Sequence, residues 1–367
     1  MPALSDQLRL SPGSLGLALM MEAVGGLAAM PFAGRVLHRI GGRTATRWFM
    51  GLWGAVLALP AVAPDLPGLI AAFICVGAVA GFTDVAIVSQ AVAAEKRLGR
   101  PVMSQLHGLW SVGSGAAAAV GALVASLGVG LRANLFAVAA ILALLGPLIA
   151  LGLPPDPARP ADSSPAEDPP RFSLPTGTVL LIGLVAFSAA FAEGSCTNWS
   201  AIYLNRVVHT SQGVSALGYT IFAWTMALTR LSGDQARQRF GPVRSVRVGG
   251  VIAIAGGAIA VVSRLAPLSI AGFVLLGAGI ALVVPLSYAA AGHLGQYPAQ
   301  AIAGVATVSY GSTLLGPGVV GGISDISSLP VAFLLITLMT VSIPLGARLM
   351  RSAQVSAPED PVTAAAA

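Results

Sequence analysis

Three carboxylates interrupt long apolar runs of the sequence and are the side chains best suited to proton or solute chemistry: Glu22, Asp84 and Glu193. A charged group at the centre of a bilayer costs about 2.5–3.5 kcal/mol on insertion scales, so it normally faces a cavity or a partner. Asp84 lies among Ala, Gly, Val and Ile and is predicted to bind and release protons or to contact a polar solute. A structural ion pair or hydrogen bond, for example to a loop arginine, is the alternative.

Glu22 lies in the middle of its apolar run, with Gly25, Gly26 and Ala29 at neighbouring positions. Small residues let a second helix approach closely, so we expect Glu22 to point into a helical bundle. Its repeat equivalent, described below, is Phe222, so the charge is not part of a shared scaffold. Cavity lining and a local hydrogen bond are both open as its role.

Further polar residues accompany these carboxylates. Glu193 is followed by Asn198 and Trp199, and His107 begins another apolar run. We expect Glu193 and Asn198 to line a solute site, with Trp199 either beside them or at the membrane interface as an anchor. His107 either relays protons or is a structural histidine held by a hydrogen bond.

Other reactive chemistries lack the residue patterns that they need. The four histidines have no metal-ligand spacing, and Cys75 and Cys196 lie in apolar runs that favour packing over a disulfide. The sequence contains no Walker motif for ATP and no triad-like constellation. We therefore expect no metal, no other cofactor and no enzymatic activity.

The composition defines the environment of these side chains. The chain is 56% hydrophobic and 9% charged, whereas a soluble domain has about 25% charged residues. The net charge of +6 is distributed in short basic bursts between apolar runs. That pattern is typical of membrane loops and not of a nucleic-acid-binding face. The sequence therefore predicts a multi-pass protein in a lipid bilayer, with no nucleic-acid partner.

Eleven apolar runs are long enough to cross a hydrocarbon core of about 30 Å, which needs roughly 20 residues. A polar, Pro-rich stretch at 153–175 separates the first five from the last six and is predicted to be a linker outside the bilayer. The predicted spans are 13–34, 45–64, 66–92, 104–128, 131–152, 176–203, 212–233, 245–264, 267–292, 300–323 and 329–349.

Basic residues divide unequally between the two sets of alternate loops. The set that includes 153–175 and the end of the chain holds fifteen of them, and the other set holds four. Cytoplasmic loops carry an excess of Lys and Arg. The linker and the C-terminus are therefore predicted to be cytoplasmic, with the chain in the bacterial cytoplasmic membrane and Met1 outside.

The sequence matches itself at a shift of 200 residues, which indicates two tandem copies of one half-protein. Arg39-Ile40-Gly41 meets Arg239-Phe240-Gly241, and Phe73 meets Phe273. Every predicted span has a partner except 176–203, whose counterpart would precede the first residue. We therefore expect a twelve-span architecture from which the first helix is missing.

The loop from Gly34 to Arg43 resembles the loop signature of the major facilitator superfamily, which has a Gly, an acidic residue, Arg, Gly and then basic residues. His38 stands where the family usually has Asp. The second copy, from Gly233 to Gly241, resembles a degenerate version of the loop. In both, Gly permits close helix approach and Arg anchors the loop at the cytoplasmic surface. The residues predicted to carry this conformational loop motif are Gly34, Arg39, Gly41, Arg43, Asp234, Arg239 and Gly241.

A narrower resemblance is carried by Gly81 to Ala86, Glu95 and Ser104 to Ser111. These segments are similar to bacterial facilitators that are themselves distantly similar to fucose:proton symporters. In the symporters an acidic residue of helix four takes part in proton coupling, and Asp84 matches its position. The chain departs from its relatives at Val88, where they tend to carry Asn, and it lacks the acidic residue of the symporters' first helix.

Together these patterns predict an all-α, polytopic membrane protein with two helical bundles. The predicted domains are a five-span bundle at 1–152, a cytoplasmic linker at 153–175, a six-span bundle at 176–350 and a cytoplasmic tail at 351–367. The resemblance implies a monomeric secondary active transporter that moves a small solute, sugar-like in the symporters, together with protons by alternating access. One alternative is a drug or metabolite exporter of the same fold. The other is a truncated membrane protein that does not transport.

Overall fold

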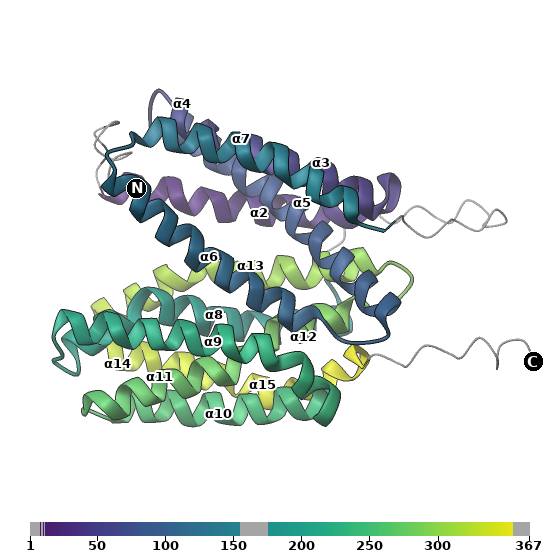
Figure 1. Ribbon diagram of the computed structural model, residues 1–367. Helices are drawn as coiled ribbons and strands as arrows, with labels where there is room; N and C mark the ends of the chain where they lie inside the picture. The colour runs from purple at the N-terminus through teal and green to yellow at the C-terminus, as the bar shows by residue number, and fades with distance from the viewer. Residues whose placement is uncertain (1–7, 9, 11, 155–174, 355–367) are drawn as a thin grey trace, which may run out of the picture. The chain divides into compact units, whose positions relative to one another are not determined.

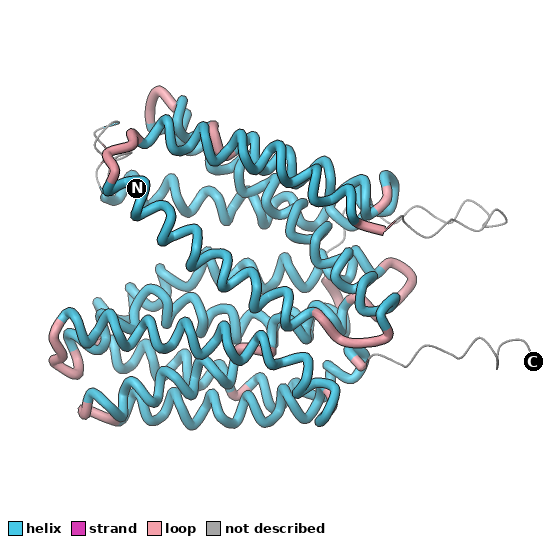
Figure 2. The backbone as a smooth tube through the Cα atoms, in the orientation of Figure 1, coloured by secondary structure: helices cyan, strands magenta, loops and turns pink. Residues whose placement is uncertain are grey.

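The regular structure of the described chain is entirely helical. The computed structural model describes residues 8, 10, 12–154 and 175–354, and no strand occurs among them (Figure 2). The predicted all-α class is therefore confirmed. The predicted linker at 153–175 and tail at 351–367 lie largely outside the described residues.

Helices coincide with all five spans predicted before the linker (Figure 1). A short helix continues the second of these spans, and a 3-10 turn continues the fifth. The elements are α2 (Pro12–Ile40), α3 (Gly42–Val56), α4 (Leu59–Val62), α5 (Leu66–Leu98), α6 (Met103–Ser126), α7 (Leu131–Ile149) and η1 (Ala150–Gly152).

Helices also coincide with the six spans predicted after the linker, although two of these spans are broken. The elements are α8 (Gly177–Arg206), α9 (Gln212–Phe240), α10 (Pro242–Val262), α11 (Ala266–Ile280), α12 (Val283–Ala291), α13 (Pro298–Ile326), α14 (Leu329–Thr340), α15 (Ser342–Gly346) and η2 (Ala347–Ala353).

Within the part of the chain that the structure describes, eight helical stretches are long and apolar enough to cross a bilayer, and each lies on one of the eleven predicted spans. A helix rises about 1.5 Å per residue, so about 20 residues cover the hydrocarbon core. The other three predicted spans lie on α6, α9 and α13. These three helices contribute many of the polar contacts of the candidate site.

The tandem repeat is visible in the helix boundaries. α2 covers residues 12–40 and α9 covers residues 212–240, which is a shift of 200. Gly41 and Gly241 follow them with similar backbone angles, φ 84° and ψ 149° against φ 79° and ψ 158°. Only glycine adopts this region without strain, so glycine at both positions allows the same turn into the next helix.

The chain forms two compact units, and each combines segments from both halves of the sequence. Unit 1 comprises Met1–Gln90, Val112–Ala190 and Leu294–Gly318, and unit 2 comprises Ala91–Ser111, Phe191–His293 and Val319–Ala367. Contacts between first-half and second-half helices therefore occur inside each unit. The predicted division into bundles on either side of 153–175 stays a prediction.

Close packing in unit 1 brings α2 against α5. A Cβ at Gly25 would collide with the Ile74 carbonyl group, and one at Gly77 would collide with the backbone of Glu22. Small residues thus let the two backbones touch, as is common between membrane helices. Phe73, on the same part of α5, belongs to a buried apolar cluster.

Unit 2 has an aromatic core. The rings of Tyr203 on α8, Phe273 on α11 and Phe333 on α14 pack edge to face, with centroids 4.9, 5.5 and 5.8 Å apart. Such edge-to-face pairs are a favourable aromatic geometry. Phe273 and its repeat equivalent Phe73 are both buried, so the repeat extends to the core of each unit.

Candidate functional site

In unit 1, a tyrosine hydroxyl contacts the carboxylate of Asp84. Tyr310 Oη on α13 donates a hydrogen bond of 2.8 Å to Asp84 Oδ2 on α5. The tyrosine ring lies beside α2, where a Cβ at Gly26 would be 3.8 Å from ring atom Cδ1. The contact therefore joins α5 to α13 and depends on a small residue of α2.

Asp84 is half-buried, and its recorded partner is a neutral donor. Among the residues that the structure describes, no arginine or lysine forms an ion pair with this carboxylate. A tyrosine hydroxyl can donate to an ionised carboxylate and can also remain bonded to a protonated one. Asp84 can therefore gain or lose a proton without breaking an ion pair.

Glu22 is placed on α2 with an exposed side chain. Its backbone carbonyl packs against Gly77 of α5. The described residues provide no recorded hydrogen bond or ion pair to its carboxylate. Its predicted role in lining a cavity stays a prediction.

In unit 2, Glu193 forms an ion pair with an arginine of α9. Arg230 Nη2 lies 2.7 Å from Glu193 Oε2, and the two side chains are 5% and 28% exposed. Arg230 Nη1 donates to Ser111 Oγ of α6 at 3.1 Å. The carboxylate of Glu193 thus neutralises a buried guanidinium and remains partly accessible.

A proline supplies another partner of Arg230. Pro285, in α12, has no backbone N–H and so cannot bond the carbonyl four residues earlier, that of Ala281. That carbonyl lies at the break between α11 and α12. Arg230 Nε donates to it at 3.2 Å. The side chain of Arg230 therefore joins α6, α8 and the break between α11 and α12.

His107 belongs to the same network. Ser111, which accepts from Arg230, donates to the backbone carbonyl of His107 at 3.0 Å. The His107 ring is near-parallel to that of Tyr288 with centroids 5.8 Å apart, and Nδ1 lies 3.0 Å from the Met103 carbonyl. The structure thus brings the predicted residues Glu193 and His107 together through Arg230 and Ser111.

Asn198 lies outside this network. Its side chain is exposed, and Nδ2 donates to the Gly194 carbonyl of its own helix at 2.8 Å. Trp199 packs beside α13, where a Cβ at Gly321 would lie 3.6 Å from the indole. The predicted role of Asn198 in a solute site stays a prediction.

The second copy of the loop motif binds the start of α6. Asp234 accepts the backbone N–H groups of Ser104 and Gln105 at 3.1 and 2.8 Å, and Ser104 Oγ donates to the Arg230 carbonyl at 2.8 Å. A carboxylate bonded to the first N–H groups of a helix caps that helix and complements its dipole. Asp234 therefore fixes α9 to α6.

A buried ion pair stands one turn further along α9. Arg237 contacts both carboxylate oxygens of Glu95, at 2.6 and 3.1 Å. Glu95 Oε1 also accepts the N–H groups of Val102 and Met103, both at 2.9 Å. Arg237 Nε donates to the Ala353 carbonyl of η2 at 2.9 Å. Because the pair is 2% and 0% exposed, it ties α5, α6, α9 and η2 together.

The first copy of the loop motif makes a different junction. Gly34 packs against α13, where its Cβ would lie 2.7 Å from Gln300 Cα. His38 meets Tyr297 edge to face, with ring centroids 5.5 Å apart. The first copy thus joins α2 to the start of α13 by close packing.

The motif arginines have separate surroundings. Arg43 Nη2 donates to the Leu151 carbonyl at 2.8 Å. Arg39 and Arg239 are exposed, and the Arg239 guanidinium carbon lies 5.5 Å from the centroid of the Phe240 ring. Arg43 is thus anchored to η1, whereas Arg39 and Arg239 extend to the surface.

The residues of these networks that were not predicted as site residues from the sequence include Arg230, Arg237 and Tyr310. Arg230 lies close to the end of the predicted run 212–233, and a lone arginine there is itself a signal of an intramembrane contact. Arg237 resembles its exposed neighbours in the sequence. Tyr310 is one of several tyrosines in apolar runs, and no local pattern distinguishes it.

The helical fold, the repeat and the charged contacts inside apolar helices define a polytopic membrane protein of the transporter class. A family model described as Major Facilitator Superfamily matches residues 1–317. The chain belongs to the major facilitator superfamily. It is therefore a membrane transporter and not an enzyme.

Two bacterial relatives support this membership. The chain is 32% identical to the uncharacterized transporter y4wD of Sinorhizobium fredii, over 92% of this chain and 89% of that protein. It is 35% identical to an uncharacterized MFS-type transporter of Yersinia pestis, over 95% of this chain and 89% of that protein. The relatives are thus named as transporters without a stated solute.

Solved structures share the fold. The fucose:proton symporter FucP, in an outward conformation, matches with a TM-score of 0.76 and 17% identity, over 95% of this chain and 93% of that one. The proton:xylose symporter XylE matches with a TM-score of 0.71 and 14% identity, over 95% and 89%. The predicted similarity to the fucose:proton symporters is confirmed at the level of the fold.

Proposed function

We propose that this protein is a secondary active transporter that works by alternating access and couples a small polar solute to protons. Membership of the superfamily establishes transport. The hydrogen bond between Asp84 and Tyr310 carries the proposal of proton coupling. It supplies an acidic group inside a span, and the recorded partner of that group is uncharged.

Asp84 is the proposed proton carrier. Its ionised form accepts the Tyr310 hydroxyl in a charge-assisted hydrogen bond, which is stronger than the bond made by the neutral carboxyl. Protonation removes a charge that costs about 2.5–3.5 kcal/mol at the centre of a bilayer. Because the bond joins α5 to α13, protonation weakens a contact between helices from the two halves of the sequence.

A solute hydroxyl suits the same carboxylate. A hydroxyl that displaces Tyr310 from Asp84 would make binding depend on the protonation of Asp84, which couples the two substrates. The fold neighbours named as fucose:proton and proton:xylose symporters support a sugar-like solute. We therefore assign a neutral, hydroxyl-rich solute to the transporter.

The proposed setting is the bacterial cytoplasmic membrane, with the linker and the C-terminus in the cytoplasm and the chain working as a monomer. The relatives are bacterial transporters. Fifteen basic residues on one set of loops against four on the other support the orientation.

Proton coupling is tested with the full chain in proteoliposomes that contain a pH-sensitive dye. Monosaccharides and polyols are added outside, and acidification of the lumen reports solute-driven proton entry. We expect at least one solute to produce a signal with the unmodified protein. Asp84→Asn should abolish it while solute exchange between the two sides continues, because exchange needs no net proton movement.

Asp65→Asn is the matched control. Asp65 stands at the start of the same helix, where Oδ1 accepts the Gly68 N–H at 2.8 Å, and Asn also caps helices well. Proton entry should be unchanged in this variant. Undiminished proton entry in Asp84→Asn would remove Asp84 from the mechanism.

A further inference from the structure

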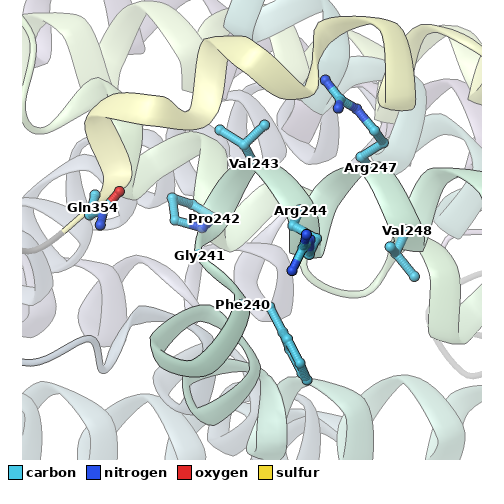
Figure 3. Close-up of a pocket in the computed structure, with 8 residues that line it drawn as sticks. All are labelled: Phe240, Gly241, Pro242, Val243, Arg244, Arg247, Val248 and Gln354. Atoms are coloured by element: carbon cyan, nitrogen blue, oxygen red, sulfur yellow. The ribbon is translucent and has the colours of Figure 1, made fainter.

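A basic cavity lies at the start of α10 in unit 2, outside the networks described above (Figure 3). Its volume is about 400 Å³, and its lining includes Phe240, Arg244, Arg247, Val248 and Gln354. Two of the lining residues are arginines and none is acidic. The cavity therefore attracts anions.

The two arginines are available to a ligand. Both are exposed, and the structure records no ion pair or hydrogen bond for either within the described residues. Figure 3 shows both arginines extending from the first turns of α10, with Arg244 nearer to Phe240. Arg237, by contrast, is fully engaged by Glu95 and Ala353. Arg244 and Arg247 thus differ from Arg237, because no contact of this kind holds their guanidinium groups within the described residues.

An apolar face of α10 continues from the cavity. Val248, Val251, Ile259 and Val262 are 52%, 56%, 37% and 80% exposed. Their spacing of three, eight and three residues places them on one side of a helix. α10 is one of the helices that are long and apolar enough to span a bilayer. This face is therefore open to lipid chains, and the arginines stand at its beginning.

The length of α10 sets the depth of the cavity. Its span of 21 residues rises about 31 Å, which is close to the thickness of the hydrocarbon core. In a helix of this length that spans the bilayer, the first turns, with Arg244 and Arg247, lie at the level of the lipid headgroups. The planar guanidinium group matches the geometry of a phosphate.

We propose that this cavity binds the phosphate headgroup of an anionic phospholipid, whose acyl chains lie along the Val248–Val262 face of α10. The proposed orientation puts the site in the cytoplasmic leaflet, where anionic lipids gather. The inference uses that orientation and does not depend on proton coupling or on the identity of the solute.

Lipid binding is measured by native mass spectrometry of the full chain in detergent, titrated with phosphatidylglycerol. Each arginine near an anionic headgroup contributes a factor of about five in affinity. Arg244→Gln with Arg247→Gln should therefore weaken binding of the first lipid by roughly 25-fold. Phosphatidylcholine should bind weakly to both the unmodified protein and the double variant.

The repeat provides a matched control. Arg47 is the equivalent of Arg247 at a shift of 200 and is also exposed. Arg47→Gln should change phosphatidylglycerol affinity by less than twofold, whereas Arg247→Gln alone should weaken it about fivefold. Equal losses of lipid affinity in the two single variants would show that the lipid responds only to the overall surface charge, and this would overturn the proposal.

Two further experiments distinguish a lipid from the other possible occupants of the cavity. Glycerol phosphate, which has the phosphate without acyl chains, should not compete at equal concentration, and full competition would assign the cavity to a free anion. Removal of residues 355–367 should leave lipid affinity unchanged. A rise after removal that requires both arginines would assign the cavity to the chain's own acidic tail.

Discussion

The junction of α9 with the start of α6 and the junction of α2 with the start of α13 occupy equivalent places in the two repeats, but different interactions hold them. Asp234 bonds two N–H groups of α6, and Arg237 binds Glu95 beside it. At the other junction, Gly34 packs on Gln300 and His38 touches Tyr297. One junction is polar and charge-assisted, and the other relies on close packing.

This difference shows that a repeated backbone can carry two kinds of contact. Gly41 and Gly241 set the same turn after each helix, so the geometry of the loop is shared. The carboxylate of Asp234 takes the place that Gly34 has in the first copy. Charge-assisted hydrogen bonds are roughly twice as strong as neutral ones, so we expect the α9–α6 junction to resist opening more than the α2–α13 junction.

The largest expected effect follows from breaking the ion pair. Arg237→Ala leaves Glu95, which is 0% exposed, as a buried charge without its partner, and this costs about 3–5 kcal/mol. Thermal unfolding of the detergent-purified protein should show a large loss of stability. Arg239→Ala, at an exposed position two residues away, should stay within about 0.5 kcal/mol of the unmodified protein. A similar loss of stability in both variants would contradict the expectation that the ion pair holds the α9–α6 junction.

An intermediate effect is expected at the packed junction. In Gly34→Ala the new methyl group would lie 2.7 Å from Gln300 Cα, and overpacking of this kind costs about 1–3 kcal/mol. Gly16 is on the same helix, and a Cβ added there would meet no described atom of a neighbouring element within 4 Å. Gly16→Ala should therefore stabilise the protein by about 0.5–1 kcal/mol. Thermal unfolding again provides the measurement. A stabilised Gly34→Ala protein would mean that α2 and α13 do not touch.

The smallest change in stability is expected when a carboxylate is added to the α2–α13 junction, so that both junctions carry a negative charge. His38→Asp places a carboxylate near Tyr297, the residue before the first turn of α13. A negative charge near a helix N-terminus stabilises by about 0.3–1 kcal/mol at low ionic strength. The gain should shrink in high salt and should be absent in His38→Asn. A gain that does not depend on salt would exclude the helix dipole as its cause.

The fold was largely predictable from the sequence because its determinants are local. Runs of about 20 apolar residues predict membrane helices directly, and helices were found at all eleven predicted positions. The shift of 200 residues aligned Gly41 with Gly241, and the structure gives both the same turn. The breaks at α11 and α12 and at α14 and α15 were not predicted, because a proline inside a membrane helix does not by itself determine a break.

The candidate networks were less predictable because their partners are distant in the sequence. Asp84 and Glu193 were selected as charges inside apolar runs, and that rule does not name a partner. Tyr310 is 226 positions from Asp84, and Arg230 is 37 positions from Glu193. Only the packing of helices brings such residues together. Helical periodicity identifies the face of a helix but not the residue that it meets.

The hydrogen bond from Arg230 to Ala281 has a consequence for the divergence of the two repeats. At the equivalent positions the first repeat has Met30 and Val85 in place of Arg230 and Pro285, and α5 runs unbroken through Val85. Proline without the arginine leaves a buried carbonyl unsatisfied, which costs about 1–3 kcal/mol, whereas valine with the arginine leaves a carbonyl that can accept from both the helical N–H and the guanidinium. The proline is therefore unfavourable unless the arginine is present. The two positions form an epistatic pair in which Arg230 makes Pro285 tolerable.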